Sequence, residues 1–431
     1  MKKQMTILLL LTALGISFAQ EPYKVPSKEV VDILDAPPTP IVSVNPTRDA
    51  MMLVEYQAHP SVALLAQPYY RIAGLRINPE LNARQRITQY TGVLIKWINT
   101  NKEVRVNLPK GATISVPLWS NDGKKIAFTR DLSDGVELWV ADASTGIAKP
   151  LANIRVNDVL GSPIEWMSDN IHVLVKTIPT GRGKAPEAPK VPVGPVIEET
   201  SGKQAGSYTY QDLLKNPHDE NLFEYFATTQ LARINSVTGA VQPIGKAGMY
   251  SAISVSPDQQ YLLVTTLKRP FSYRVPSFYF SRTVDVLDKI GVVVRTIADF
   301  GVSDDIPTQG VVTGPRGVEW QALHNSTLVW SEALDGGDPK AKVPHRDQLM
   351  SLSAPFKGNA RLVTKLEHRY AGFNWTAAKD VAFLSEYNRD RRWRTTYVVN
   401  VTDPEKTRKT LFDLSVQDAY NDPGNPIYSM T

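Results

Sequence analysis

The densest group of side chains suited to binding a charged ligand is a run of arginines near the C-terminus. Arg389, Arg391, Arg392 and Arg394 lie close together and flank Trp393. A guanidinium presents parallel N–H donors that match the two oxygens of a carboxylate, so this run predicts an anchor for an acidic substrate or partner. The alternative is a solvated connection between two strands, with Trp393 packed below it.

Two further arginines stand in the segment YYRIAGLRI, residues 69–77. If this segment is one strand, Arg71 and Arg76 fall on opposite faces, because side chains alternate along a strand and their separation is odd. One of them would then point at the axis of the molecule or at a docked domain and bind substrate there. The alternative role for both is a structural ion pair.

Motifs of nucleophilic, metal or phosphate chemistry are not found in the sequence. There is no Gly-x-Ser-x-Gly, which presents a serine on a strained turn, and no Gly-x-Gly-x-x-Gly. The six histidines are dispersed, so we expect no catalytic residue, no metal and no cofactor in this chain. Asp335-Gly336-Gly337-Asp338 has the acidic ends of a calcium loop without its further ligands, and we expect a turn there.

The elements that must position these residues are predicted to be short, repeated β-strands. The best-formed unit spans residues 115–151, where strands are expected to end at Trp119, to cover Lys125–Thr129 and Glu137–Ala141, and to begin at Ile147. Asp122-Gly123 is typical of a tight hairpin turn. Leu138 and Val140 should lie on one face of the third strand and Trp139 on the other. Four such antiparallel strands in chain order form one blade of a β-propeller.

Weaker copies of this unit recur along the chain. Their first strands are expected to end at Val44, Trp119, Trp166, Val255, Trp320 and Trp375. The predicted fold class is therefore all-β: a β-propeller of four-stranded antiparallel blades over residues 41–431, with about six blades visible. Residues 426–430 would either pair with the last partial blade and close the ring or begin a seventh blade, and we expect the second, a fragment with an incomplete propeller. Residues 20–40 are predicted to form an N-terminal strap and residues 179–207 a mobile insertion.

The N-terminus and the composition predict an exported protein. Lys2 and Lys3 precede the apolar run Ile7–Ile16, and Ser17-Phe18-Ala19 places small residues before Gln20, so residues 1–19 are predicted to be a signal peptide. The run is too short for a membrane anchor, which needs about 20 residues. An extracytoplasmic location follows, with no membrane contact after cleavage. The formal net charge of +5 is too small and scattered to predict nucleic-acid binding, and with no cysteine the domain cannot hold disulfides.

Four longer blocks carry a family resemblance. They are YYRIAGLRINP at 69–79, TYQDLLKNPHDENLFEYFATTQL at 209–231, YLLVTTLKRPFSYRVP at 261–276 and EALDGGDPKAKVPHRD at 332–347. In these blocks, and from about Tyr23 to its end, the chain resembles the glutamyl endopeptidase-like branch of the prolyl oligopeptidase family. The resemblance implies an N-terminal β-propeller joined to a C-terminal α/β-hydrolase domain with a Ser-Asp-His triad, and cleavage of peptides with a preference for glutamate.

The chain departs from that family because the α/β-hydrolase domain is expected to be absent. The resemblance then implies the substrate-gating propeller of a secreted serine peptidase, inactive by itself, whose partners are peptide substrates and the hydrolase domain of a full-length protein. A second interpretation is a freestanding exported propeller of the TolB type that binds a protein or ligand. A third, hydrolysis of peptides by this chain itself, predicts labelling by a fluorophosphonate serine probe, which we do not expect.

Overall fold

A computed structural model describes residues 24–151, 153–191, 194 and 208–424, and the chain divides into two compact units at Pro38. In the first unit, residues 1–38, the described part contains the helix α2 (Lys28–Leu34), which has no buried residue. The second unit, residues 39–431, holds all the strands of the described chain. The predicted signal peptide at 1–19 and the predicted strand at 426–430 lie outside the described residues.

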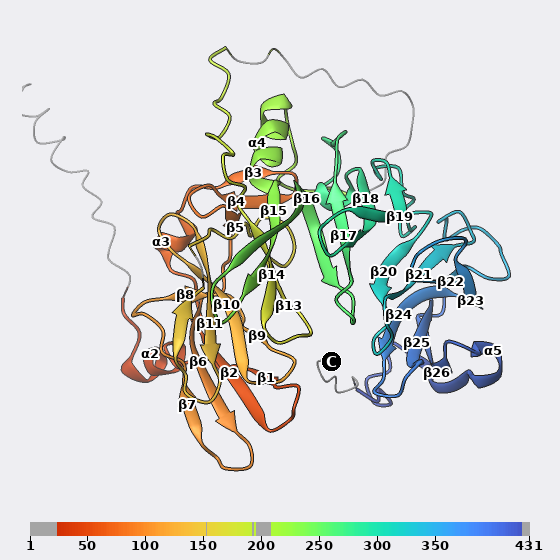
Figure 1. Ribbon diagram of the computed structural model, residues 1–431, viewed down its shortest axis with the longest axis horizontal. Helices are drawn as coiled ribbons and strands as arrows, with labels where there is room; N and C mark the ends of the chain where they lie inside the picture. The colour runs from red at the N-terminus through yellow and green to blue at the C-terminus, as the bar shows by residue number, and fades with distance from the viewer. Residues whose placement is uncertain (1–23, 152, 192–193, 195–207, 425–431) are drawn as a thin grey trace, which may run out of the picture. The chain divides into compact units, whose positions relative to one another are not determined.

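The described part of the second unit contains six antiparallel meanders of four strands (Figure 1). The first three are β1 (Ile41–Val44), β2 (Ala50–Tyr56), β6 (Tyr90–Trp97) and β7 (Glu103–Arg105); β9 (Leu118–Trp119), β10 (Lys125–Asp131), β11 (Val136–Asp142) and β12 (Ala148–Pro150); and β13 (Ile164–Trp166), β14 (His172–Thr177), β15 (Thr229–Asn235) and the start of β16 (Val241–Val255). The next three are the end of β16 with β17 (Tyr261–Leu267), β18 (Arg282–Asp288) and β19 (Val293–Phe300); β20 (Arg316–Trp320), β21 (Thr327–Ala333), β22 (Asp347–Ser353) and β23 (Arg361–Leu366); and β24 (Arg369–Trp375), β25 (Val381–Asn388), β26 (Trp393–Asn400) and β27 (Lys409–Ser415). The predicted all-β fold of repeated four-stranded propeller blades is thereby confirmed.

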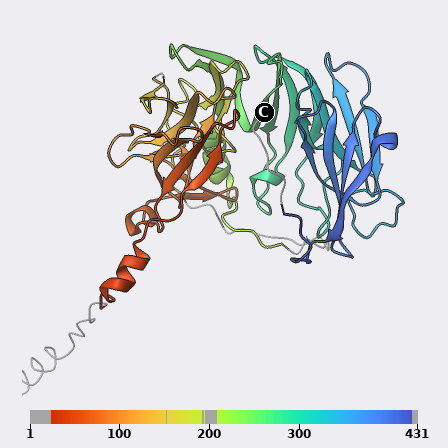
Figure 2. The ribbon, with the colours of Figure 1, turned by 90° about the horizontal axis from the view of Figure 1, so that it is seen from below.

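The repeated tryptophans set the register between neighbouring meanders. The indole Nε1 atoms of Trp119, Trp166 and Trp320 donate to the backbone oxygens of Ser43, Leu118 and Ser254 at 3.3, 3.0 and 3.3 Å. Each acceptor is the residue before the end of the first strand in the preceding meander. The spacing seen in the sequence therefore corresponds to one physical contact, made three times, which holds consecutive meanders side by side (Figure 2).

The apolar core lies in layers between the meanders. On β11, Leu138 and Val140 pack with Val173 of the third meander, whereas Trp139 joins Met52 and other residues of the first. The predicted split of these side chains between two faces is correct, and both faces are buried because a neighbouring meander covers each.

Connections alternate between the two ends of the meanders, because each strand reverses the direction of the one before it. The short-turn end carries the connections from first to second and from third to fourth strand, such as residues 120–124 and 143–147. The long-connection end carries the connections from second to third strand, and four of these are long. The first covers residues 57–89 and contains α3 (Val62–Leu65), β3 (Tyr70–Ile72), β4 (Leu75–Asn78) and β5 (Ala83–Arg84). The others cover residues 178–228, with α4 (Pro217–Ala227); residues 268–281, with the 3-10 helix η1 (Ser277–Tyr279); and residues 334–346.

One strand assignment was wrong. Residues 69–77 form a hairpin of β3 (Tyr70–Ile72) and β4 (Leu75–Asn78), which joins β5 (Ala83–Arg84) in a separate three-stranded sheet. Ala73 and Gly74 have φ angles of 55° and 76°, the left-handed pair that a two-residue hairpin turn requires. The fourth strand of the first meander is β7 instead, which is short and polar and therefore gave no clear alternation.

The predicted insertion at 179–207 begins with a described stretch that contacts the rest of the second unit. The guanidinium of Arg182 lies 4.0 Å from the ring centroid of Tyr225 and donates to Asn82 Oδ1 at 2.6 Å. No helix in the described ranges is long and apolar enough to cross a membrane.

Candidate functional face

The long-connection end gathers the four sequence blocks that carry the family resemblance. Each block includes a connection from the second to the third strand of a meander, so residues far apart in the chain reach the same end. In Figure 1, α4 and the β3–β5 sheet lie together at the top of the second unit, above β14, β15 and β16. We therefore treat this end as the candidate functional face.

An apolar cluster joins these connections and is called the aromatic cap here. It contains Ile72 and Ile77 of the β3–β4 hairpin, Leu222, Phe223 and Phe226 of α4, and Phe280 after η1. Phe223 is fully buried, and its ring centroid lies 5.3 Å from that of Phe271 and 5.6 Å from that of Phe280, both edge to face. Burial of rings from several segments gives these irregular connections a core of their own.

Helix α4 is oriented by its cap and by one arginine. Asn216 precedes it, and its Oδ1 accepts the backbone N–H of Asp219 at 2.9 Å, while Pro217 occupies the first turn, where no N–H is needed. Arg269, in the connection from β17 to β18, forms ion pairs with Glu220 and Glu224 of α4, the latter at 2.8 Å. The arginine thereby ties the fourth meander to the helix inserted in the third.

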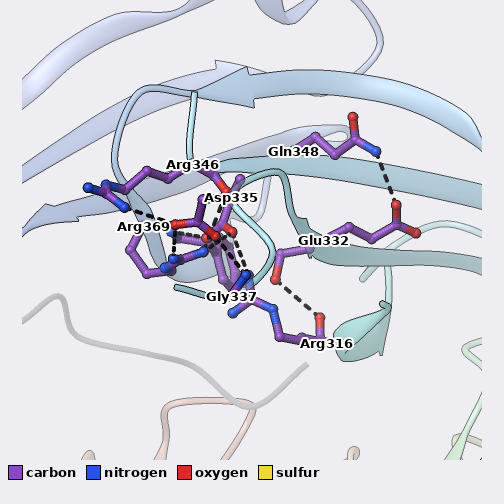
Figure 3. A network of polar contacts seen from close by, with 10 residues as sticks. Arg316, Glu332, Asp335, Gly337, Arg346, Gln348 and Arg369 are labelled. Atoms are coloured by element: carbon purple, nitrogen blue, oxygen red, sulfur yellow. Dashed lines mark hydrogen bonds and ion pairs between the residues drawn. The ribbon is translucent and has the colours of Figure 1, made fainter. Parts of the chain in front are cut away.

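A buried network of carboxylates and arginines occupies the same end between the fifth and sixth meanders (Figure 3). The Asp347 side chain is fully buried and accepts hydrogen bonds from Arg316 Nη2 at 2.6 Å, Arg369 Nη1 at 2.7 Å and the backbone N–H of Tyr370 at 2.6 Å. The Asp335 side chain is also fully buried and accepts from Arg369 and from Arg346 Nη1 at 2.9 Å. Arg369 therefore bridges the two carboxylates, and the network joins the two meanders.

Ion pairs and hydrogen bonds favour the charged form of Asp335 in this network. Burial raises the pKa of Asp335, but the hydrogen bonds and charges of Arg369 and Arg346 outweigh it and hold that pKa below its ordinary value. With three guanidiniums against two carboxylates, the group carries a net positive charge of one. Charges removed from water are costly unless they are paired. Loss of either Asp335 or Asp347 would therefore leave arginines of the network buried with less compensation.

Another buried carboxyl, that of Glu319, lies farther along β20. Burial raises the pKa of Glu319 to about 7, although the indole of Trp375 acts in the opposite direction by favouring the charged carboxylate. The Oε1 atom of Glu319 is buried. Burial, followed by the charge of Glu319, also raises the pKa of Tyr370 on the neighbouring β24. A neutral carboxyl is therefore favoured here, whereas the charged form is favoured at Asp335.

The predicted arginine run occupies the turn between β25 and β26. Arg389, Arg391, Arg392 and Arg394 are exposed, and Arg391 lies over the Trp393 ring at 4.7 Å from its centroid. Arg394 lines a cavity of about 340 Å³ on the sixth meander. The geometry is that of the solvated strand connection we considered as the alternative, and a role in substrate binding stays a prediction.

The prediction that Arg71 and Arg76 lie on opposite faces is wrong. They are directly paired across the β3–β4 hairpin, because the chain reverses between them and the odd separation no longer applies. Arg76 Nε bonds Asp212 Oδ2 at 2.9 Å, so a structural ion pair exists, while Arg71 is exposed.

Asp335 illustrates what the sequence motif search missed. The turn expected at residues 335–338 is present, with Gly336 and Gly337 at φ of 65° and 77°. Its first carboxylate, Asp335, binds Arg346 from the same connection and Arg369 from β24. Among the described residues no group of three or more His, Asp or Glu is placed to hold a metal. The available signal was the block at 332–347, which contains both aspartates and Arg346.

Three cavities surround the segment 301–315, which joins β19 to β20. They measure about 610, 470 and 580 Å³, and Ile306 lines all three. The second cavity is lined by Arg282 and Arg316 and the first and third by aspartates among other residues. The long-connection end is therefore hollowed beside the buried network.

Comparison with known proteins finds similar sequences along nearly the whole chain. No family model matches the sequence. A protein of Oryza sativa subsp. japonica called probable glutamyl endopeptidase, chloroplastic, is 35% identical over 435 residues, which covers 96% of this chain and 46% of the relative. A protein of the same name from Arabidopsis thaliana is 37% identical over 428 residues, covering 95% of this chain and 44% of the relative. The chain spans less than half the length of these relatives.

Solved structures show weaker likeness. Acylaminoacyl peptidase of Pyrococcus horikoshii has a TM-score of 0.43 at 13% identity, over 85% of this chain and 45% of its own. The β-propeller domain of the Trilobed protease from Pyrococcus furiosus has a TM-score of 0.37 at 12% identity, over 85% of this chain and 98% of its own. The sequence comparison is the stronger of the two, and it confirms the resemblance: over nearly its whole length the chain is similar to proteins named probable glutamyl endopeptidase, and it corresponds to a part of them.

Proposed function

We propose that this chain is the substrate-gating β-propeller of an exported serine peptidase that cleaves peptides after glutamate. The observation that carries the proposal is the 35–37% identity with probable glutamyl endopeptidases along 95–96% of this chain. The chain spans less than half the length of those relatives. The rest of such a protein would hold an α/β-hydrolase domain with the serine nucleophile. The propeller would admit peptides to that domain and exclude folded proteins.

The long-connection end is the side proposed to meet the hydrolase domain and the substrate. Its connections are long, share the aromatic cap and are hollowed by cavities, whereas the short-turn end offers tight turns. A buried ionic network beneath this surface would keep the gate rigid, since its partners come from separate strands.

The first test is the coding sequence downstream of Thr431, followed by assay of the encoded protein. We expect an in-frame continuation that encodes Gly-x-Ser-x-Gly and a product that cleaves Glu-containing peptides faster than matched Gln peptides. The 431-residue chain by itself should not react with a fluorophosphonate probe. A stop codon directly after Thr431, with a chain that binds a periplasmic protein, would replace the proposal by the freestanding TolB-type propeller.

Export is tested by the mature N-terminus. We expect the protein recovered from its native host to begin at Gln20 and to lie outside the cytoplasm. The curated relatives carry chloroplastic names, so retention of residues 1–19 on a cytoplasmic protein would remove export from the proposal and leave the peptidase role standing.

The arginine run is proposed as an anchor for acidic substrate. Replacement of Arg391 and Arg392 by alanine in the full-length enzyme should lower the ratio of kcat/KM for Glu over Gln peptides. The exposed Arg295 on β19 offers a matched control. An unchanged ratio in the double variant would exclude the run from substrate recognition.

A further inference from the structure

The cavity between the fourth and fifth meanders at the long-connection end is unusual in its charge. It measures about 470 Å³, and Arg282 and Arg316 line it together with Phe278, Tyr279 and Phe300. Its described lining contains no aspartate or glutamate, in contrast to the two adjacent cavities, which include Asp299 or Asp304. Two guanidiniums thus meet around an opening that supplies no counter-charge.

Arg282 is held in place without an acidic partner. Its Nη1 atom donates to the backbone oxygens of Phe278 and Phe280 at 3.3 Å each, and its guanidinium carbon lies 4.6 Å from the Phe300 ring centroid. No carboxylate of the described residues forms an ion pair with it. Burial lowers the pKa of Arg282, yet a guanidinium stays protonated in proteins. Arg282 therefore carries a partly desolvated positive charge that a bound anion would stabilise.

Arg316 reaches the same cavity from the buried network. Its Nη2 atom bonds Asp347 Oδ1 at 2.6 Å, while its Nε atom is buried and has no hydrogen-bond partner among the described residues. Asp347 is shared with Arg369, so Arg316 is only partly neutralised. An unpaired buried donor costs free energy until an acceptor enters, and an anionic acceptor gains most.

We propose that this cavity is a subsite for a carboxylate carried on a peptide, with Arg282 as the residue that selects it. Phe300 would hold the guanidinium flat, while Phe278 and Tyr279 would contact the apolar part of the same residue. The inference rests on the proposed function only in taking a peptide as the ligand. It adds a place of acid recognition at the fourth and fifth meanders, separate from the anchor proposed for the arginine run at 389–394.

The test measures binding, which does not depend on hydrolysis. Dye-labelled, acetylated and amidated peptides with one Glu, or with Gln at that position, are titrated with the 431-residue chain by fluorescence anisotropy. We expect about tenfold tighter binding of the Glu peptide, because a charge-assisted contact is worth roughly that factor. A Gln peptide with a free C-terminal carboxylate forms a third arm, and preference for it would assign the subsite to chain ends instead of side chains.

Variants then locate the preference. Arg282→Gln should remove most of the Glu preference, Arg282→Lys should keep part of it, and the exposed control Arg295→Gln should leave it unchanged. Equal binding of Glu and Gln peptides by the unaltered chain would overturn the subsite while leaving the proposed function open to its own cleavage test. A preference lost in Arg391→Gln/Arg392→Gln and kept in Arg282→Gln would overturn its location.

A second measurement needs no variant and therefore does not depend on folding of Arg282→Gln. Phenylglyoxal modifies accessible guanidiniums, and the modified sites are read by mass spectrometry. Glutarate should protect Arg282 several-fold more than the neutral glutaramide does, and Arg295 should react equally with either present. Equal modification of Arg282 in glutarate and glutaramide would overturn the proposal.

Discussion

At the short-turn end, the same hydrogen bonds recur in the second and fourth meanders, whereas at the long-connection end a charged network joins residues from several segments. Ser120 Oγ bonds Asp122 at 2.7 Å and accepts the N–H of Lys125 at 3.0 Å, and Ser256 repeats both bonds with Asp258 and Tyr261 at the same distances. The Asp335–Asp347 network instead joins β20, β22, β24 and the connection 334–346. Local contacts therefore build the scaffold, and non-local charge pairs build the candidate functional face.

The largest effect is expected at the long-connection end. Asp347→Asn should lower the free energy of unfolding by about 3–5 kcal/mol, because Arg316 and Arg369 would remain buried with less compensation. Urea unfolding followed by circular dichroism measures it. The exposed Asp390→Asn is the control and should change stability by less than about 0.5 kcal/mol. A loss of the same small size in Asp347→Asn would show that the network is not desolvated.

An intermediate effect should depend on pH. The folded chain keeps Glu319 protonated up to about pH 7, whereas the unfolded chain releases that proton near pH 4.5, so stability falls as pH rises through this window. Glu319→Gln removes the fall, and at pH 8 the variant should gain about 1–3 kcal/mol relative to the unaltered chain.

Urea midpoints at pH 5 and pH 8 measure this difference. Glu367→Gln is the matched control, because that side chain is 74% exposed. A difference between Glu319→Gln and the unaltered chain that stays constant from pH 5 to pH 8 would mean that Glu319 is hydrated in the native state.

The smallest effect is expected at the short-turn end. Trp119→Phe removes the indole donor to Ser43 and part of the buried ring, at a cost of about 1–2 kcal/mol. Because the contact recurs independently, the losses of Trp119→Phe and Trp320→Phe should add within about 0.5 kcal/mol. Strong non-additivity in urea unfolding would show that the two tryptophan contacts are coupled, and the contacts at the short-turn end would then not be independent.

The repeated part of the fold was predictable because its information is local. Tight turns such as Asp122-Gly123 and the alternation around Leu138 and Trp139 lie within a few residues, and the structure has these strands where they were expected. The β3–β4 hairpin was missed for a related reason: Ala73 adopts a left-handed φ that its residue type does not favour, so the turn had no clear signal.

The candidate site was less predictable because it depends on which distant residues meet. The arginine run was found by its density, yet it occupies an exposed turn, while Arg282 and Arg316 are isolated in the sequence and meet at one cavity. Charge density along a chain does not report desolvation, which depends on neighbouring segments.

The sequence by itself determined the all-β class, the number of visible repeats and the relation to glutamyl endopeptidases, since turn chemistry, side-chain alternation and long matching blocks are properties of contiguous residues. Only the tertiary structure decided that these blocks share one end of the meanders. It also decided that Asp335 is favoured in its charged form while Glu319 is favoured neutral, because burial and the approach of guanidiniums set the charge state of a carboxyl.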